Sequence, residues 1–299
     1  MSRTRELVEG LRMALGVADP MPPRIEALRI PDPPVRIFPS PHKASAVAKE
    51  AAKHTTALVG IGRVGTRYAT SVVLQFQAEL AVAHGAVATE LPDGWAEENG
   101  LLPLQTRVTE HRQFLLRPDL GRRLSEESLA LLRTQATKGV DIQPILADGL
   151  SAVACMGSGT ELLRLLTEQC AARGMTVGTP MCAKFARVWL EDEIGQEVGA
   201  KVAVILLGER PGLGTGDGLS AYMVYEPRIG KTDGDRNMIS NIHARGTTPP
   251  EAAGRLASFA AAMMDQRTSG VSLDLSRVGV GADTAFRPPQ VRLPLVEVE

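Results

Sequence analysis

The chain has 299 residues, of which 44% are hydrophobic, so it is long enough to bury a core in one large or two modest domains. Its 33 Lys and Arg residues nearly balance 34 Asp and Glu residues, and no basic block stands out, which argues against nucleic acid as a partner. Three cysteines without metal-ligand spacing are typical of reduced thiols in a cytoplasmic protein. We find neither a secretory apolar stretch nor a run of about 20 apolar residues, so we expect no membrane span.

Residues 1–42 combine a short amphipathic helix with a proline-rich linker. Leu7, Leu11 and Leu15 are spaced four apart among charged residues, which predicts the apolar stripe of a helix. Eight prolines from Asp19 to Pro41 then exclude regular structure and indicate a semi-stiff linker. A helix on such a tether resembles the peptides that lead enzymes into protein-shelled microcompartments, and a frayed terminus without a target is the alternative.

Residues 43–101 are expected to form a small helical subdomain, because 43–56 and 67–84 are rich in alanine with helical spacing. Between these segments Gly60, Gly62 and Gly65 match the spacing of a dinucleotide-binding loop. That loop needs a strand before it, a helix after it and an acid about 20 residues later. Only a short apolar run precedes these glycines, so we favour a plain turn. A nucleotide-dependent oxidoreductase using Gly60 to Gly65 is the alternative function.

From residue 102 to 275 short strands alternate with capped helices, which is typical of an α/β fold with a Rossmann-like, doubly wound sheet. The central strand is expected at 201–207, where a run of branched apolar residues ends at Gly208. Further extended segments are expected at 105–109, 113–116, 142–147, 175–177, 185–190 and 219–225, with a polar loop at 231–245. Residues 276–299 are expected to be a loose tail or an added edge strand.

Three predicted helices have recognisable first turns. Ser125 is expected to cap one of them, and capping boxes are expected at Ser158 with Glu161 and at Thr248 with Glu251. The helices should therefore start close to these residues.

Acidic side chains follow two of the predicted strands. Asp148 comes after 142–147 and Glu209 after the central strand, so we expect both at the carboxyl edge of the sheet, in one crevice. Glu209 would repel phosphate, whereas a carboxylate is a strong acceptor for a ligand that carries amides. Ion pairs that fix loops are the alternative role for these acids.

A near-match to a cobalamin motif lies in the predicted polar loop. Asn241, His243 and Gly246 follow the pattern Asp-x-His-x-x-Gly, by which some cobalamin enzymes supply a histidine to cobalt, except that Asn replaces Asp. Without that acid the imidazole lacks the partner that usually orients a metal ligand. We therefore expect His243 to be a hydrogen-bonding loop residue and not a cobalt ligand.

Seven motifs between about residues 62 and 273, together and in this order, closely resemble the light (small) chain of ethanolamine ammonia-lyase. They are Arg117-Pro-Asp-Leu-Gly-Arg122, Asp148-Gly-Leu-Ser151, Val177-Gly-Thr-Pro180, Arg187-Val-Trp-Leu-Glu-Asp-Glu-Ile-Gly195, Gly208-Glu-Arg-Pro-Gly-Leu-Gly214, Asp235-Arg-Asn-Met-Ile-Ser-Asn-Ile-His243 and the helix that follows Thr248.

The resemblance implies an enzyme that uses adenosylcobalamin to convert ethanolamine to acetaldehyde and ammonia by a radical mechanism. Substrate and radical chemistry would belong to a separate large chain, and this chain, inactive alone, would cover the corrin and lower-base side with the base still on cobalt. Six large and six small chains would assemble, in the cytoplasm or inside a microcompartment.

Carried over residue by residue, the family's cobalamin contacts fall on Val188, Glu209 and Met238, and no catalytic residue falls on this chain. Glu209 matches the family residue. Met238 stands where relatives have a cysteine, so the resemblance implies a backbone contact there more readily than a thiol contact.

Overall fold

The structure is a computed structural model that describes residues 61, 63–213 and 216–279. The chain divides into two compact units, Met1–Ala78 and Glu79–Glu299, which are described separately below. The predicted N-terminal helix with its linker, the segment 43–56 and most of the C-terminal tail lie outside the described residues. The predicted domain limits stay predictions.

A small hairpin opens the described part of the chain. β1 (Arg63–Val64) pairs antiparallel with β2 (Arg67–Tyr68), and Gly65 turns between them with a φ of 62°. This positive φ suits glycine, which has no Cβ. α3 (Thr70–Ala88) follows and confirms the helix expected near 67–84. Gly65 thus leads into an exposed antiparallel strand and not into the helix that a dinucleotide-binding loop requires, so this stretch does not favour an oxidoreductase.

A six-stranded sheet organises the second unit, in the spatial order β3-β5-β4-β6-β7-β8. β3, β5, β4 and β6 are parallel, whereas β7 and β8 are added antiparallel. The strands are β3 (Leu102–Gln105), β4 (Ile142–Ala147), β5 (Met181–Lys184), β6 (Val202–Gly208), β7 (Leu219–Tyr225) and β8 (Arg236–Ile242). The α/β class is confirmed, and the sheet is mixed.

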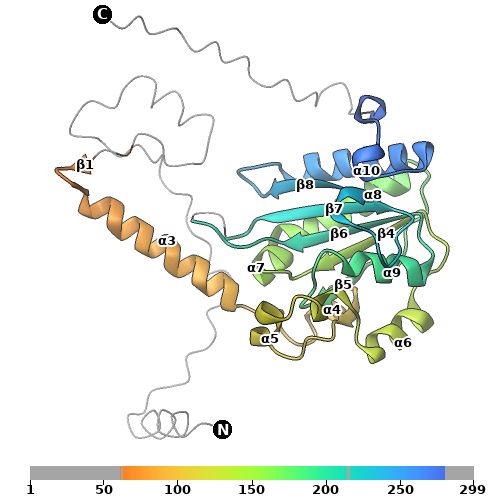
Figure 1. The fold of residues 1–299 in the computed structure, drawn as a ribbon, viewed down its shortest axis with the longest axis horizontal. Helices are drawn as coiled ribbons and strands as arrows, with labels where there is room; N and C mark the ends of the chain where they lie inside the picture. The colour runs from red at the N-terminus through yellow and green to blue at the C-terminus, as the bar shows by residue number, and fades with distance from the viewer. Residues whose placement is uncertain (1–60, 62, 214–215, 280–299) are drawn as a thin grey trace, which may run out of the picture. The chain divides into compact units, whose positions relative to one another are not determined.

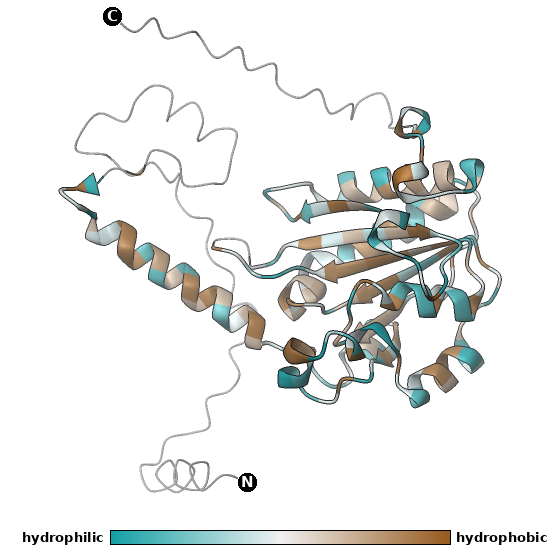
Figure 2. Cartoon of the chain, viewed as in Figure 1, coloured by the Kyte–Doolittle hydropathy of each residue, from teal (hydrophilic) through white to brown (hydrophobic). Residues whose placement is uncertain are grey.

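The central strands are the most deeply buried part of this sheet. Every residue of β4 and β6 is buried, as predicted for β6 from its apolar run, and Figure 2 shows the inner strands mostly in the hydrophobic colours. The two strands pair in parallel from Ile142 opposite Val202 to Ala147 opposite Leu207. Each fully buried Val, Leu or Ile contributes about 1.5–3 kcal/mol relative to exposure. This burial fixes the edge at which the polar residues after β4 and β6 emerge.

Helices cover both faces of the sheet (Figure 1). α8 and α10 pack with one core cluster, and α6 and α9 pack with the cluster on the opposite face. The helices of this unit are α4 (Trp95–Glu98), α5 (His111–Leu116), α6 (Glu126–Gln135), α7 (Ala152–Ala154), α8 (Thr160–Ala172), α9 (Leu190–Val198) and α10 (Pro249–Gln266). Across the described ranges, none of the helices is long and apolar enough to cross a bilayer.

Several predicted strands are wrong. Residues 113–116 belong to α5, where Phe114 is buried while Leu115 and Leu116 are exposed, so a single apolar anchor holds a helical turn. The third strand expected at 175–177 is only a bridge at Val177, and β5 begins four residues after it. β5 was missed because its residues lack the branched side chains by which strands are recognised.

The expectations for 185–190 and 231–245 are also wrong. The first segment is a turn that enters α9, and Phe185 within it has a φ of 57°, which is incompatible with a strand. The second contains β8, whose sequence is polar because it is an edge strand with one covered face.

Helix caps followed the predictions only in part. Ser125 caps α6 as expected, and its hydroxyl accepts from the backbone N–H of Ser128 at 3.2 Å. The box at Ser158 is wrong, because helical turns run from α7 through a π-helical turn, Cys155–Gly159, directly into α8. Thr248 precedes α10 as predicted, with prolines in the first turn, but makes no side-chain cap, and Glu251 pairs with Arg255 instead.

Candidate functional site

Glu209 is the first residue after β6, where the chain leaves the buried centre of the sheet. Its backbone N–H donates to the carbonyl of Gly218 at 2.9 Å, which closes the start of the β6–β7 connection. Its carboxylate Oε1 accepts a hydrogen bond from the Tyr222 hydroxyl at 3.1 Å. The hydroxyl therefore orients the carboxylate over β7.

The electrostatics of this pair keep the hydroxyl as a donor. Burial and the neighbouring Glu209 carboxylate raise the pKa of Tyr222 to about 12, so the phenol stays protonated at neutral pH. A carboxylate offers about four lone-pair sites, and the bond from Tyr222 occupies one of them. Glu209 thus keeps acceptor capacity for N–H donors such as amides.

Met238 lies on the neighbouring strand, directly opposite Tyr222 in the β7–β8 register. Its side chain is 51% exposed, whereas the next residue, Ile239, packs against the core on the other face of the sheet. Because side chains alternate along a strand, Met238 shares a face with Tyr222. A flexible thioether there offers a soft apolar contact surface.

Val188 lies in the turn between β5 and α9. Its carbonyl accepts from the N–H of Glu191 at 3.2 Å, and the preceding residue, Arg187, donates its N–H to the Gly121 carbonyl at 2.8 Å. The Val188 side chain is partly buried and packs against the same core cluster as Tyr222. The three residues identified by resemblance, Val188, Glu209 and Met238, therefore belong to one face of the sheet, the face that α9 covers in part.

Tyr222 is the member of this face that the sequence did not reveal. It bonds Glu209, pairs with Met238 and packs with the cluster that holds Val188. Its strand was predicted with correct bounds, but β8 was not, so its cross-strand neighbour could not be identified.

The Asp148 carboxylate forms hydrogen bonds with a different segment from that bound by Glu209. Its carboxylate accepts from the N–H groups of Phe185 at 2.8 Å and Ala186 at 3.2 Å, and burial raises its pKa to about 7. It therefore fixes the turn after β5, whereas Glu209 is held by β7 on the opposite side of the two central strands. The expectation that both acids line one crevice is wrong.

The carboxyl ends of β4 and β6 leave no room between them. A Cβ on Gly208 would lie 2.3 Å from the carbonyl oxygens of Asp148 and Ser151, and a Cβ on Gly149 would lie 2.3 Å from the Gly208 oxygen. Leu150 also donates its N–H to the Gly208 carbonyl at 2.9 Å. Backbone contact fills this junction, so a ligand would meet the face beside it.

His243 is engaged through both ring nitrogens. Nε2 is 2.7 Å from the Asn241 Oδ1, and Nδ1 accepts from the Arg245 N–H at 3.2 Å. The residue is 1% exposed, and burial lowers its pKa, which favours the neutral ring. These contacts agree with a loop-fixing role and leave no ring nitrogen for a metal.

A cleft of about 520 Å³ lies elsewhere, at the carboxyl ends of β3 and β5. Gln105, Thr106 and Phe185 line it together with Lys184, whose ammonium pairs with Glu90 at 3.0 Å. Val188, Glu209 and Met238 do not line this cleft. Within the described residues, no group of three or more His, Cys, Asp or Glu side chains is arranged to hold a metal ion.

A known protein-family model matches most of the chain. The model of the ethanolamine ammonia-lyase light chain family (EutC) matches residues 45–274, which is well over half of the chain and includes every strand of the sheet. The residues of the α9 face, from Val188 to Met238, all fall inside the matched region. The chain therefore belongs to the ethanolamine ammonia-lyase light chain family.

Proposed function

We propose that this chain is the small subunit of an adenosylcobalamin-dependent ethanolamine ammonia-lyase, which converts ethanolamine to acetaldehyde and ammonia. In this proposal the chain contributes Val188, Glu209 and Met238 to the cobalamin site. The observation that carries it is the Glu209 carboxylate, held by Tyr222 beside the exposed side chain of Met238.

The chemistry of this face suits a corrinoid. A corrin ring carries amide side chains around an apolar edge, and the face offers an oriented carboxylate next to apolar side chains. When bound, the cofactor supplies a cobalt–carbon bond whose homolysis starts radical chemistry. The residues of this chain would hold the amide periphery and keep water from the corrin.

His243 supports a cofactor that keeps its own lower base on cobalt. A protein ligand to cobalt would need a free ring nitrogen, and the ring nitrogens of His243 are both hydrogen-bonded in the loop after β8. We therefore propose base-on binding, with this chain close to the lower-base side.

A second chain is part of the proposal. The α9 face is an open surface, and a site for radical chemistry has to exclude water, so a large subunit would close it and supply the substrate site. We propose heterodimers gathered into an assembly of six large and six small chains, with this chain inactive alone. The N-terminal helix predicted around Leu11 would direct the assembly to a microcompartment, and deletion of residues 1–20 should then abolish its co-fractionation with shell proteins.

The test of the cofactor site is replacement of Glu209. In the reconstituted two-chain complex, Glu209→Ala should weaken cobalamin affinity by roughly 1.5–3 kcal/mol, the range for hydrogen bonds to charged groups. Equilibrium titration with cobalamin, followed by absorbance, measures the change against the wild-type complex.

Glu251→Ala is the matched control, because Glu251 is also partly buried but lies at the start of α10, outside the proposed site. It should leave the affinity unchanged. Equal affinities for the wild type and Glu209→Ala would remove Glu209 from the site, and absence of cobalamin binding by the wild-type complex would overturn the proposed function.

A further inference from the structure

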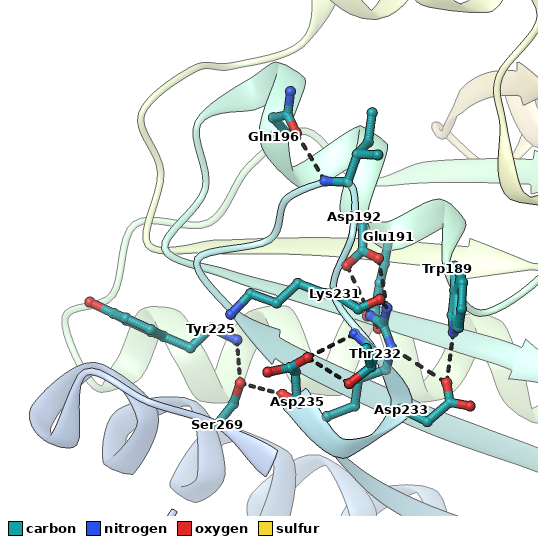
Figure 3. Close-up of polar contacts among 12 residues, drawn as sticks. Trp189, Glu191, Asp192, Gln196, Tyr225, Lys231, Thr232, Asp233, Asp235 and Ser269 are labelled. Atoms are coloured by element: carbon teal, nitrogen blue, oxygen red, sulfur yellow. Dashed lines mark hydrogen bonds and ion pairs between the residues drawn. The ribbon is translucent and has the colours of Figure 1, made fainter. Parts of the chain in front are cut away.

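A buried ion cluster lies beside the candidate site, where β8 meets α9 (Figure 3). The Arg236 side chain is 2% exposed and donates to Glu191 Oε1 at 2.6 Å. It also forms a two-pronged pair with Asp192, at 3.0 Å and 2.6 Å. The guanidinium thus bonds two consecutive residues of the first turn of α9.

Stability alone explains this cluster poorly. Two acidic side chains crowd one guanidinium, and Glu191 Oε2 is buried with no hydrogen-bond partner among the described residues. Desolvation of such a group costs free energy that apolar side chains of similar volume would not incur. Directional contacts between planar groups instead fix the relative position of the two elements that carry them.

The cluster joins the segments that carry two of the three proposed cofactor contacts. Arg236 lies two residues before Met238 on the same face of β8. Glu191 and Asp192 follow Val188 by three and four residues, within the same helical entry turn. A shift of the guanidinium would therefore change the distance between Val188 and Met238.

Trp189 extends this link to the neighbouring loop. Its indole N–H donates to Asp233 Oδ1 at 2.6 Å, and the Arg236 guanidinium carbon lies 6.0 Å from the centre of its ring. The Arg122 guanidinium lies 4.4 Å from the centre of the same ring. The residue next to Val188 thus contacts Arg236 at the start of β8 and Asp233 just before it.

We propose that Arg236 is a positioning residue of the cofactor site, which sets the spacing between Val188 and Met238 through Glu191 and Asp192. This inference rests on the proposed function and assigns a role to a buried residue that lies beside Met238 on the same face of the sheet. Arg236 itself would not touch cobalamin.

The test uses Arg236→Lys in the reconstituted two-chain complex. Lysine keeps the charge but cannot bond Glu191 and Asp192 with a planar fork. We expect cobalamin affinity to fall roughly tenfold or more, because misplaced contacts lose most of their directional energy. Asp192→Asn, which removes one arm of the pair, is the second variant and should act in the same direction.

Leu166→Ala is the control for general destabilisation, because Leu166 is fully buried on α8, on the opposite face of the sheet. Its melting temperature should fall at least as far as that of Arg236→Lys, while cobalamin affinity stays within about twofold of the wild type. If Leu166→Ala and Arg236→Lys lose equal stability and also lose equal cobalamin affinity, Arg236 has no positioning role.

A double-mutant cycle distinguishes a positioning role of Arg236 from a purely structural one. If Arg236 acts through Met238, the double variant of Arg236→Lys and Met238→Ala should lose less cobalamin affinity than the two single variants lose in sum. Additive effects would overturn the inference. Loss of affinity in Glu209→Ala with unaltered affinity in Arg236→Lys and Asp192→Asn would also overturn it, and would leave the proposed function standing.

Discussion

Tyr222 is the residue at which the proposed cofactor contacts meet. Glu209 and Met238 are separated by 28 intervening residues in the sequence and come together because β6, β7 and β8 are neighbours in the sheet. The tyrosine lies on the middle strand of the three and touches both sides, through its hydroxyl and through its place in the register. Replacement of Tyr222 should therefore weaken cofactor binding, although the family resemblance did not identify this residue.

The first prediction at the residue scale concerns the Tyr222 hydroxyl. Tyr222→Phe removes one hydrogen bond to Glu209 and should weaken cobalamin affinity of the two-chain complex by about 1 kcal/mol, less than Glu209→Ala. Tyr225→Phe is the control, because Tyr225 lies on the same strand but packs against the opposite core. A loss in Tyr222→Phe as large as that in Glu209→Ala would show that the tyrosine binds the cofactor directly.

A second residue, Glu191, makes the stability of the chain depend on pH. Burial raises its pKa to about 8 from an ordinary 4.5, so the folded chain keeps a proton that the unfolded chain loses. The free energy of unfolding should therefore fall as pH rises from about 4.5 to about 8. Glu191→Gln has no such proton to release, so its unfolding free energy should fall less over this range.

Urea unfolding of both proteins across that pH range measures the difference. Glu161→Gln, at an exposed position of α8, should keep the pH dependence of the wild type. Parallel curves for the wild type and Glu191→Gln would show that Glu191 is ionised throughout in the folded chain.

At the scale of elements, the junction between β4 and β6 decides where a ligand can approach. The sequence predicts both strands, and most clearly β6 with its unbroken apolar run, but it does not show that their carboxyl ends touch. Gly208 makes this contact possible, since any Cβ would overlap the carbonyl oxygens of Asp148 and Ser151. The two acids are engaged on different sides of this junction, Asp148 by the turn after β5 and Glu209 by β7.

Gly208→Ala should consequently destabilise the chain. Overpacking against backbone atoms that cannot rotate away costs roughly 1–3 kcal/mol, and here two carbonyls are affected. Gly218→Ala is a matched control in the same β6–β7 connection, because nothing lies within 4 Å of its Cβ position. The midpoints of urea unfolding compare the two, and equal midpoints would show that the junction can open.

Sequence prediction succeeded where an element has a clear local pattern of apolar residues. β4 and β7 were predicted with their observed bounds, whereas β5 and β8 were missed, since β5 lacks branched residues, β8 is mostly polar, and the pairing of both is set by distant neighbours. The burial of the acidic first turn of α9 was not predicted. The partner that buries it, Arg236, lies 44 residues beyond Asp192. Glu209 and Met238 were identified from family motifs, and their contacts came only from the fold.

At the scale of the whole molecule, the described part of the second unit presents the proposed contact residues on its surface. Met238 is half exposed, and the carboxylate of Glu209 is held by Tyr222 with acceptor sites to spare. A corrinoid between this face and a second chain would bury these groups from both sides. In the proposed complex the fold of the second unit would be a rigid support for one wall of the shared site.

Because Met238 is exposed, oxidation of its thioether can report whether this face is covered. Hydrogen peroxide oxidises accessible methionine to the sulfoxide, so Met238 should react rapidly in the separate chain and slowly in the cofactor-loaded two-chain complex. Met223, which is 1% exposed, should react slowly in both. Peptide mass spectrometry measures the two rates, and an unprotected Met238 in the complex would show that nothing covers this face. A subunit still without its partner would carry an oxidant-sensitive sulfur at the contact surface, and damage there would lower the yield of assembly before any catalytic turnover began.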